Sequence, residues 1–81
     1  MGNPDVCLKI LAVERILKNN PQGVTIKQII EKLDNHYGIK AERKSILRNI
    51  ATLTRFMPIY EYRDGTKVMY CLEKGWNNGY F

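Results

Sequence analysis

Residues that build most catalytic and metal sites are scarce in this chain of 81 residues. It has one histidine, His36, and two cysteines, Cys7 and Cys71, with no cluster of metal ligands at useful spacing. It also lacks a convergent carboxylate pair and a glycine motif that could cradle phosphates. A chain this short forms a single domain, residues 1–81, with one core and no room for a supported catalytic cleft. We therefore expect no enzymatic activity, metal, cofactor or small-molecule substrate.

Long apolar runs and targeting signals are missing as well. No apolar segment approaches the roughly 20 residues that span a bilayer, and the N-terminus has no basic region followed by an apolar one. We therefore expect no membrane insertion and a cytoplasmic location. For the two distant cysteines, buried reduced thiols are expected, with a disulfide as the alternative.

Positive charge, by contrast, is plentiful and concentrated in residues 40–55, KAERKSILRNIATLTR. The chain carries a formal net charge of +5 with a pI near 9.4, and five cations against Glu42 give this segment +4 of that charge. At helical spacing the segment has an apolar stripe on one side. The opposite, polar side is predicted to hold Lys44, Ser45, Arg48, Asn49, Thr52 and Arg55. Long cations mixed with short polar groups suit the phosphates and base edges of a DNA major groove, while a solvated surface helix is the alternative reading.

Two amphipathic helices are predicted ahead of the basic segment. The first should span residues 4–19, after the start signal of Asn3 and proline, and its apolar stripe is Val6, Ile10, Val13, Ile16 and Leu17. Leu8 and Leu11 lie off that stripe, so either a partner or the C-terminal residues would cover them.

The second helix has clear signals at both ends. Thr25 and Gln28 fit a capping box, and Gly38 after Tyr37 fits a left-handed residue that ends the helix. His36 is expected to face solvent in the last turn.

After the basic helix, which Pro58 should end, the apolar period changes to two. This period predicts a β-hairpin with Asp64 and Gly65 as its turn, Tyr62 opposite Lys67, and Val24 pairing alongside. The face with Ile59, Val68, Tyr70 and Leu72 should close the core. Cations flanking the turn are typical of a wing over a phosphate backbone or minor groove, although a purely structural hairpin is the alternative.

The C-terminal residues carry three large aromatics, Trp76, Tyr80 and Phe81. These side chains would pack on the domain, join two copies, or begin a further segment. Residues 1–3 and 77–81 are accordingly expected to be frayed or partner-binding tails.

The order of helix, helix, basic helix and hairpin resembles the winged helix-turn-helix domain at the N-terminus of WYL-domain and DeoR-like bacterial transcription regulators. The resemblance covers about residues 8–76 and is most specific in TIKQIIEKLDNHYGIKAERKSILRNIATL, residues 25–53. It implies an α+β fold, three helices followed by a β-hairpin wing, and a transcription factor. Asn49 stands where that family usually has an acid and Glu42 is a weak cap, so the family's base preference is not carried over.

The expected function is sequence-selective binding of double-stranded DNA in transcription regulation, close to the nucleoid. The third helix would lie in the major groove and the wing over the backbone or minor groove, with a homodimer on a palindromic site. The expected base contacts are Ser45, Arg48, Asn49 and Thr52. The expected phosphate contacts are Thr25, Lys27, Arg43, Lys44, Arg55, Arg63 and Lys67. The alternative function is a protein-interaction winged helix that reads no DNA, and the chain would be either a stand-alone binder or a fragment of a longer regulator.

Overall fold

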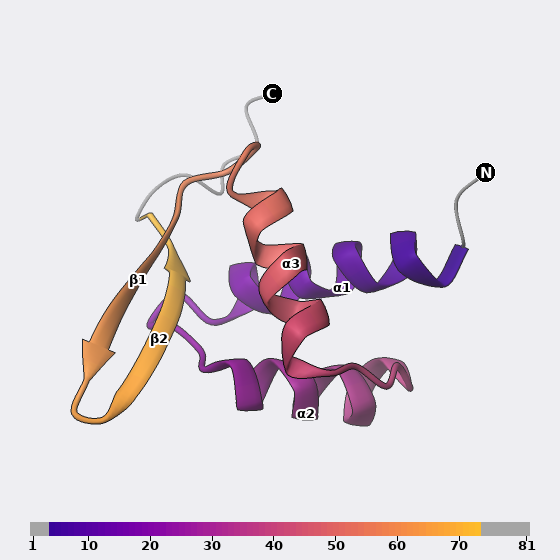
Figure 1. The fold of residues 1–81 in the computed structure, drawn as a ribbon, viewed down its shortest axis with the longest axis horizontal. Helices are drawn as coiled ribbons and strands as arrows, with labels where there is room; N and C mark the ends of the chain where they lie inside the picture. The colour runs from indigo at the N-terminus through magenta and orange to yellow at the C-terminus, as the bar shows by residue number, and fades with distance from the viewer. Residues whose placement is uncertain (1–3, 74–81) are drawn as a thin grey trace.

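The computed structural model describes residues 4–73, with side chains from residue 8 onward, and this part of the chain folds as three helices followed by an antiparallel hairpin (Figure 1). The elements are α1 (Pro4–Asn19), α2 (Ile26–Tyr37), α3 (Arg43–Leu53), β1 (Ile59–Asp64) and β2 (Lys67–Leu72). The predicted α+β class and the order of the elements are confirmed. None of the described helices is long and apolar enough to cross a membrane.

Local signals set both ends of α2 as predicted. The Thr25 hydroxyl accepts the Gln28 N–H (3.1 Å) and the Gln28 side-chain oxygen accepts the Thr25 N–H (3.0 Å), which completes the capping box. At the other end Gly38 has φ +66°, a left-handed conformation that glycine adopts without steric cost. The Ile39 N–H then bonds to the Leu33 carbonyl (3.0 Å), so the chain turns sharply into the connection that leads to α3.

The core lies between the three helices and one face of the hairpin. Its largest fully buried side chains are Leu17, Ile29, Leu33, Ile46, Val13, Val24 and Cys71. The predicted stripe of α1 is confirmed at Val13, Ile16 and Leu17, while Val6 lies outside the described side chains. Cys71 carries a free, buried thiol, as expected, and the side chain of Cys7 also lies outside the described set.

The hairpin packs against the helices through the predicted face, in a different register. Asp64 pairs with Lys67 and Tyr62 with Met69, so the predicted pairing of Tyr62 with Lys67 is wrong. The two turn residues are Gly65 and Thr66, between the paired residues Asp64 and Lys67. Gly65 has φ +68°, and glycine readily adopts the positive φ that two-residue hairpin turns favour at their first position. Each residue of β1 therefore pairs with a residue of β2 two positions later than predicted. Because side chains alternate between the two faces of a strand, a shift of two residues leaves every side chain on its predicted face.

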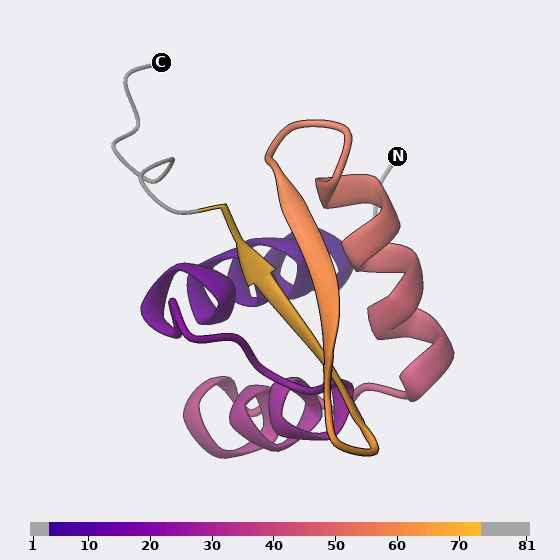
Figure 2. The ribbon, with the colours of Figure 1, turned by 90° about the vertical axis from the view of Figure 1, so that its left-hand side faces the viewer.

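Val24 forms an isolated antiparallel bridge with Tyr70 of β2. Its N–H bonds to the Tyr70 carbonyl (2.9 Å), and the Tyr70 N–H bonds to the Val24 carbonyl (2.8 Å), which confirms the predicted pairing. The α1–α2 connection is thereby joined to the hairpin. In Figure 2 the hairpin runs diagonally across the helices, and its turn lies at the end of the molecule where α2 is found.

The third helix is shorter than predicted. It ends at Leu53 rather than at Pro58, because Arg55 and Phe56 bond to the carbonyls of Thr52 (3.1 Å) and Leu53 (2.9 Å) in a tighter turn. Met57 nevertheless remains buried, so the apolar stripe continues past the end of the helix.

Candidate nucleic-acid interface

The side chains of α3 fall into rows that face different surroundings, because residues four apart lie on roughly the same side of a helix. The row toward the core and toward α1 contains Ser45 and Asn49, and the outward row contains Lys44, Arg48 and Thr52. A third row, on the other flank, contains Arg43, Leu47 and Ala51, all of them exposed. The surroundings of each row decide which residues are available to a nucleic acid.

Asn49 is not on the outward face, contrary to the prediction. It is 6% exposed and belongs to the buried side of α3 with Ile46, Ile50 and Leu53. Its position three residues after Ile46 and four before Leu53 places it at the edge of the apolar stripe. Its Nδ2 group has no hydrogen-bond partner among the described residues. The predicted base contact at Asn49 is therefore withdrawn.

Ser45 is engaged inside the domain. Lys9 of α1 donates a hydrogen bond to the Ser45 hydroxyl, and both side chains are partly buried. The contact ties α1 to the first turn of α3, so this flank of α3 faces α1. Lys9 was missed by the sequence reasoning, because nothing in local spacing shows that residues 9 and 45 meet.

Arg48 and Thr52 have the exposure that a base contact requires. Both are exposed in the outward row, together with Lys44. Arg55, in the turn after α3, is exposed as well. No ion pair or hydrogen bond of these four side chains is found among residues 8–73.

Four of the residues predicted to contact phosphate lie together around one groove of about 480 Å³. Thr25 and Lys27 come from the start of α2, Arg43 from the start of α3, and Lys67 from the hairpin. The groove is also lined by Ile26, Gln28, Glu31, Thr66 and Val68. The remaining predicted phosphate contacts, Lys44, Arg55 and Arg63, are exposed but lie outside the groove.

The electrostatics of this groove favour an anion. Three cations, Lys27, Arg43 and Lys67, line the groove together with one acid, Glu31. The first turn of α2 holds no acidic residue, so no side chain there neutralises the positive end of the helix dipole. The Thr25 hydroxyl accepts a bond in the capping box and keeps its own proton to donate. Burial, with a further contribution from Glu61, raises the pKa of Tyr70 on the hairpin, and the Arg43 charge acts against that rise.

The arrangement has a winged-helix-like topology. No protein-family model, characterised protein or solved structure matches the chain. We refer to the hairpin, β1 and β2 with their turn, as the wing.

The wing is fixed to the helices by a specific hydrogen bond. The Tyr62 hydroxyl donates to the Gln22 carbonyl (2.6 Å), in the connection between α1 and α2. Gly23 beside it is buried with φ +107°, and a Cβ there would lie 3.1 Å from the Tyr62 hydroxyl oxygen, so glycine allows this close approach. This contact holds the wing in the orientation that closes one side of the groove.

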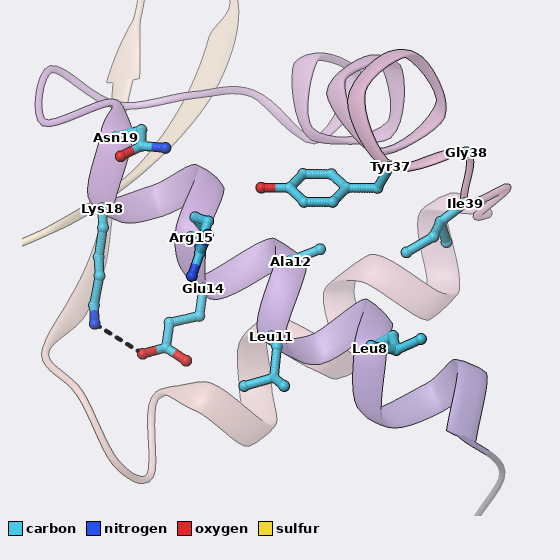
Figure 3. Close-up of a pocket in the computed structure, with 10 residues that line it drawn as sticks. All are labelled: Leu8, Leu11, Ala12, Glu14, Arg15, Lys18, Asn19, Tyr37, Gly38 and Ile39. Carbon is cyan, nitrogen blue, oxygen red and sulfur yellow. Dashed lines mark ion pairs between the residues drawn. The ribbon is translucent and has the colours of Figure 1, made fainter.

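A second surface lies on the α1 side of the molecule (Figure 3). Leu8 and Leu11 are 57% and 58% exposed, as their position off the stripe predicted, and Tyr37 of α2 projects over the same groove of about 780 Å³. Lys18 and Glu14 pair at 3.0 Å along its edge. The C-terminal aromatic residues that were considered as a cover lie outside the described residues.

Proposed function

We propose that this chain binds double-stranded DNA with sequence selectivity in transcription regulation, in the manner of a winged helix-turn-helix. The observation that carries the proposal is the groove that brings together Thr25, Lys27, Arg43 and Lys67 from three separate elements. A solvated surface helix would give no reason for cations of α2 and the wing to converge beside it. The resemblance of residues 25–53 to WYL-domain and DeoR-like regulators supports the same function.

In this arrangement the groove receives the phosphates of one strand while α3 lies in the major groove. Backbone phosphate contacts fix the register of a protein on DNA and carry no sequence information by themselves. Lys44, Arg55 and Arg63, which are exposed outside the groove, would reach neighbouring phosphates. If about five phosphates are neutralised, affinity falls by roughly 500-fold between about 50 and 200 mM salt.

Sequence selectivity comes from the outward row of α3. Arg48 can pair with O6 and N7 of guanine, a bidentate contact that contributes about 1–3 kcal/mol of discrimination. Thr52 follows one turn later and offers a hydroxyl and a methyl group. One small module reads a short site, so we propose a homodimer on a palindromic sequence.

The function is tested by selecting bound sequences from a random duplex library and then titrating the best-bound duplex at several salt concentrations. Wild type should bind with a steep salt dependence, and Arg48→Ala should lose preference at one position of the selected site. Binding that does not depend on salt, or an unchanged preference in Arg48→Ala, would contradict DNA readout by α3.

A second candidate function is the binding of a protein partner without DNA readout. The exposed Leu8 and Leu11 beside Tyr37 favour it, because three large apolar side chains share one groove. Size-exclusion chromatography with light scattering, with and without duplex, separates the two functions. A complex that gains the mass of the duplex supports DNA binding, and an assembly that forms without duplex and takes up none when duplex is added supports protein interaction.

A further inference from the structure

The exposed surface of α3 contains an apolar strip next to its cations. Leu47 is 37% exposed, and Ala51, one turn later, is exposed as well. Leu47 and Ala51 continue the row that begins at Arg43, which lines the groove with Lys27 and Lys67. Since each step of four residues advances by about 40° around the helix, the strip runs from the groove side toward the outward row.

The placement of this strip decides which flank of α3 a duplex would meet. The opposite flank, with Ser45 and Asn49, is turned toward α1 and the core. A duplex whose phosphates occupy the groove would approach α3 from the side of Arg43, so its bases would face Leu47, Arg48 and Ala51. The sequence predicted only polar side chains as base contacts. In the structure Leu47 and Ala51 are exposed where Ser45 and Asn49 are not, so they take the places of those two residues among the candidate base contacts.

We propose that Leu47 and Ala51 read the 5-methyl groups of thymine, so the target site carries thymine next to the guanine contacted by Arg48. This inference rests on the proposed function and adds the chemistry of the bases that it recognises. In the major groove the C5-methyl group is the one apolar feature of the four bases, and apolar side chains are its usual partners. Two exposed apolar side chains one turn apart would contact methyl groups at neighbouring positions.

Replacing thymine by uracil tests the proposal, because this change removes the methyl group and keeps every hydrogen-bonding group of the base pair. The probe is the best-bound duplex from the random library, with uracil placed at one thymine at a time. For wild type we expect a loss of about fourfold at each contacted thymine, the effect of one buried CH₂-sized group.

Two variants test which residue causes the loss of affinity when uracil replaces thymine. Leu47→Ala removes an exposed side chain, so the fold should persist, and the variant should lose sensitivity to uracil at one position. Arg48→Ala is the matched control: it should bind less tightly with its sensitivity to uracil intact. Circular dichroism of both variants checks that they are folded.

Three outcomes would overturn the inference while DNA binding itself stands. These are a selected site without thymine, equal binding of uracil and thymine at every position, and unchanged sensitivity to uracil in Leu47→Ala. Absence of selective duplex binding in wild type would instead overturn the proposed function, and this inference with it.

Discussion

Lys9 of α1 donates a hydrogen bond to Ser45 of α3, so the first helix holds the flank of the third helix that was expected to read bases. In the proposed mode of binding a duplex would meet one side of α3, and this contact places the side with Ser45 inside the domain. Together with the burial of Asn49, it leaves the rows of Lys44 and Arg43 as the exposed surface of α3.

Ser45→Ala should therefore leave base preference unchanged. Loss of the hydroxyl removes a hydrogen bond within the domain, which contributes about 0.5–1.5 kcal/mol to stability, and affects no proposed base contact. Arg48→Ala should keep that stability and relax preference at one base. Sequence selection combined with thermal unfolding of both variants checks this, and altered base preference in Ser45→Ala would contradict it.

Asn49→Leu should stabilise the protein. The Asn49 Nδ2 group is buried without a partner among the described residues, and an unsatisfied buried polar group costs about 1–3 kcal/mol. Leucine has the same number and branching of side-chain heavy atoms and no polar group to satisfy. Denaturant unfolding should show a higher midpoint, with duplex affinity unchanged. Asn49→Asp, which places a carboxylate in the same position, should destabilise the fold. A loss of duplex affinity in Asn49→Leu at unchanged stability would show that Asn49 contacts DNA.

Tyr62→Phe should loosen the wing. The lost hydrogen bond from its hydroxyl to the Gln22 carbonyl contributes about 0.5–1.5 kcal/mol. Limited trypsin digestion should cut faster at Arg63 or Lys67, which flank the turn. Tyr37→Phe, at the end of α2 on the other groove, serves as the matched control and should be cut at the wild-type rate. Equal cleavage of all three proteins would mean that the hydroxyl does not fix the wing.

Stability should decrease at alkaline pH through Tyr70. Burial raises the pKa of this phenol above its ordinary value of 10.0. The unfolded chain therefore loses the proton first as the pH rises past about 10, so the stabilising contribution is complete below that pH and is lost above it. Urea unfolding between pH 9 and pH 11, run on wild type and Tyr70→Phe, tests this. The variant should show a weaker pH dependence, and identical slopes would exclude Tyr70 as the cause.

Local signals in the sequence predicted most of the fold. The capping box of Thr25 and Gln28, the left-handed Gly38 and the alternation after Pro58 each depend on neighbours within a few residues. The two errors were also local in origin: a glycine-threonine turn replaced the expected aspartate-glycine turn, and α3 ended in a tight turn before Pro58.

The candidate site was less predictable, because it depends on how distant elements meet. Residue type and charge selected Thr25, Lys27, Arg43 and Lys67, but their convergence follows from the packing of α2, α3 and the wing. Asn49 was misplaced because an asparagine at the edge of an apolar stripe has no local feature that distinguishes burial from exposure. The row that starts at Arg43 was visible in the four-residue spacing of α3, yet nothing local showed that this row begins at a groove.

The proposed DNA binding depends on the positive charge that converges on the groove, and the salt dependence of duplex binding measures that charge. Arg43→Ala should weaken binding to all duplexes alike and reduce the slope of log affinity against log salt by about 1. The matched control is Arg15→Ala, an exposed arginine on the other groove, which should keep the wild-type slope. Equal slopes for wild type, Arg43→Ala and Arg15→Ala would contradict a phosphate site in this groove.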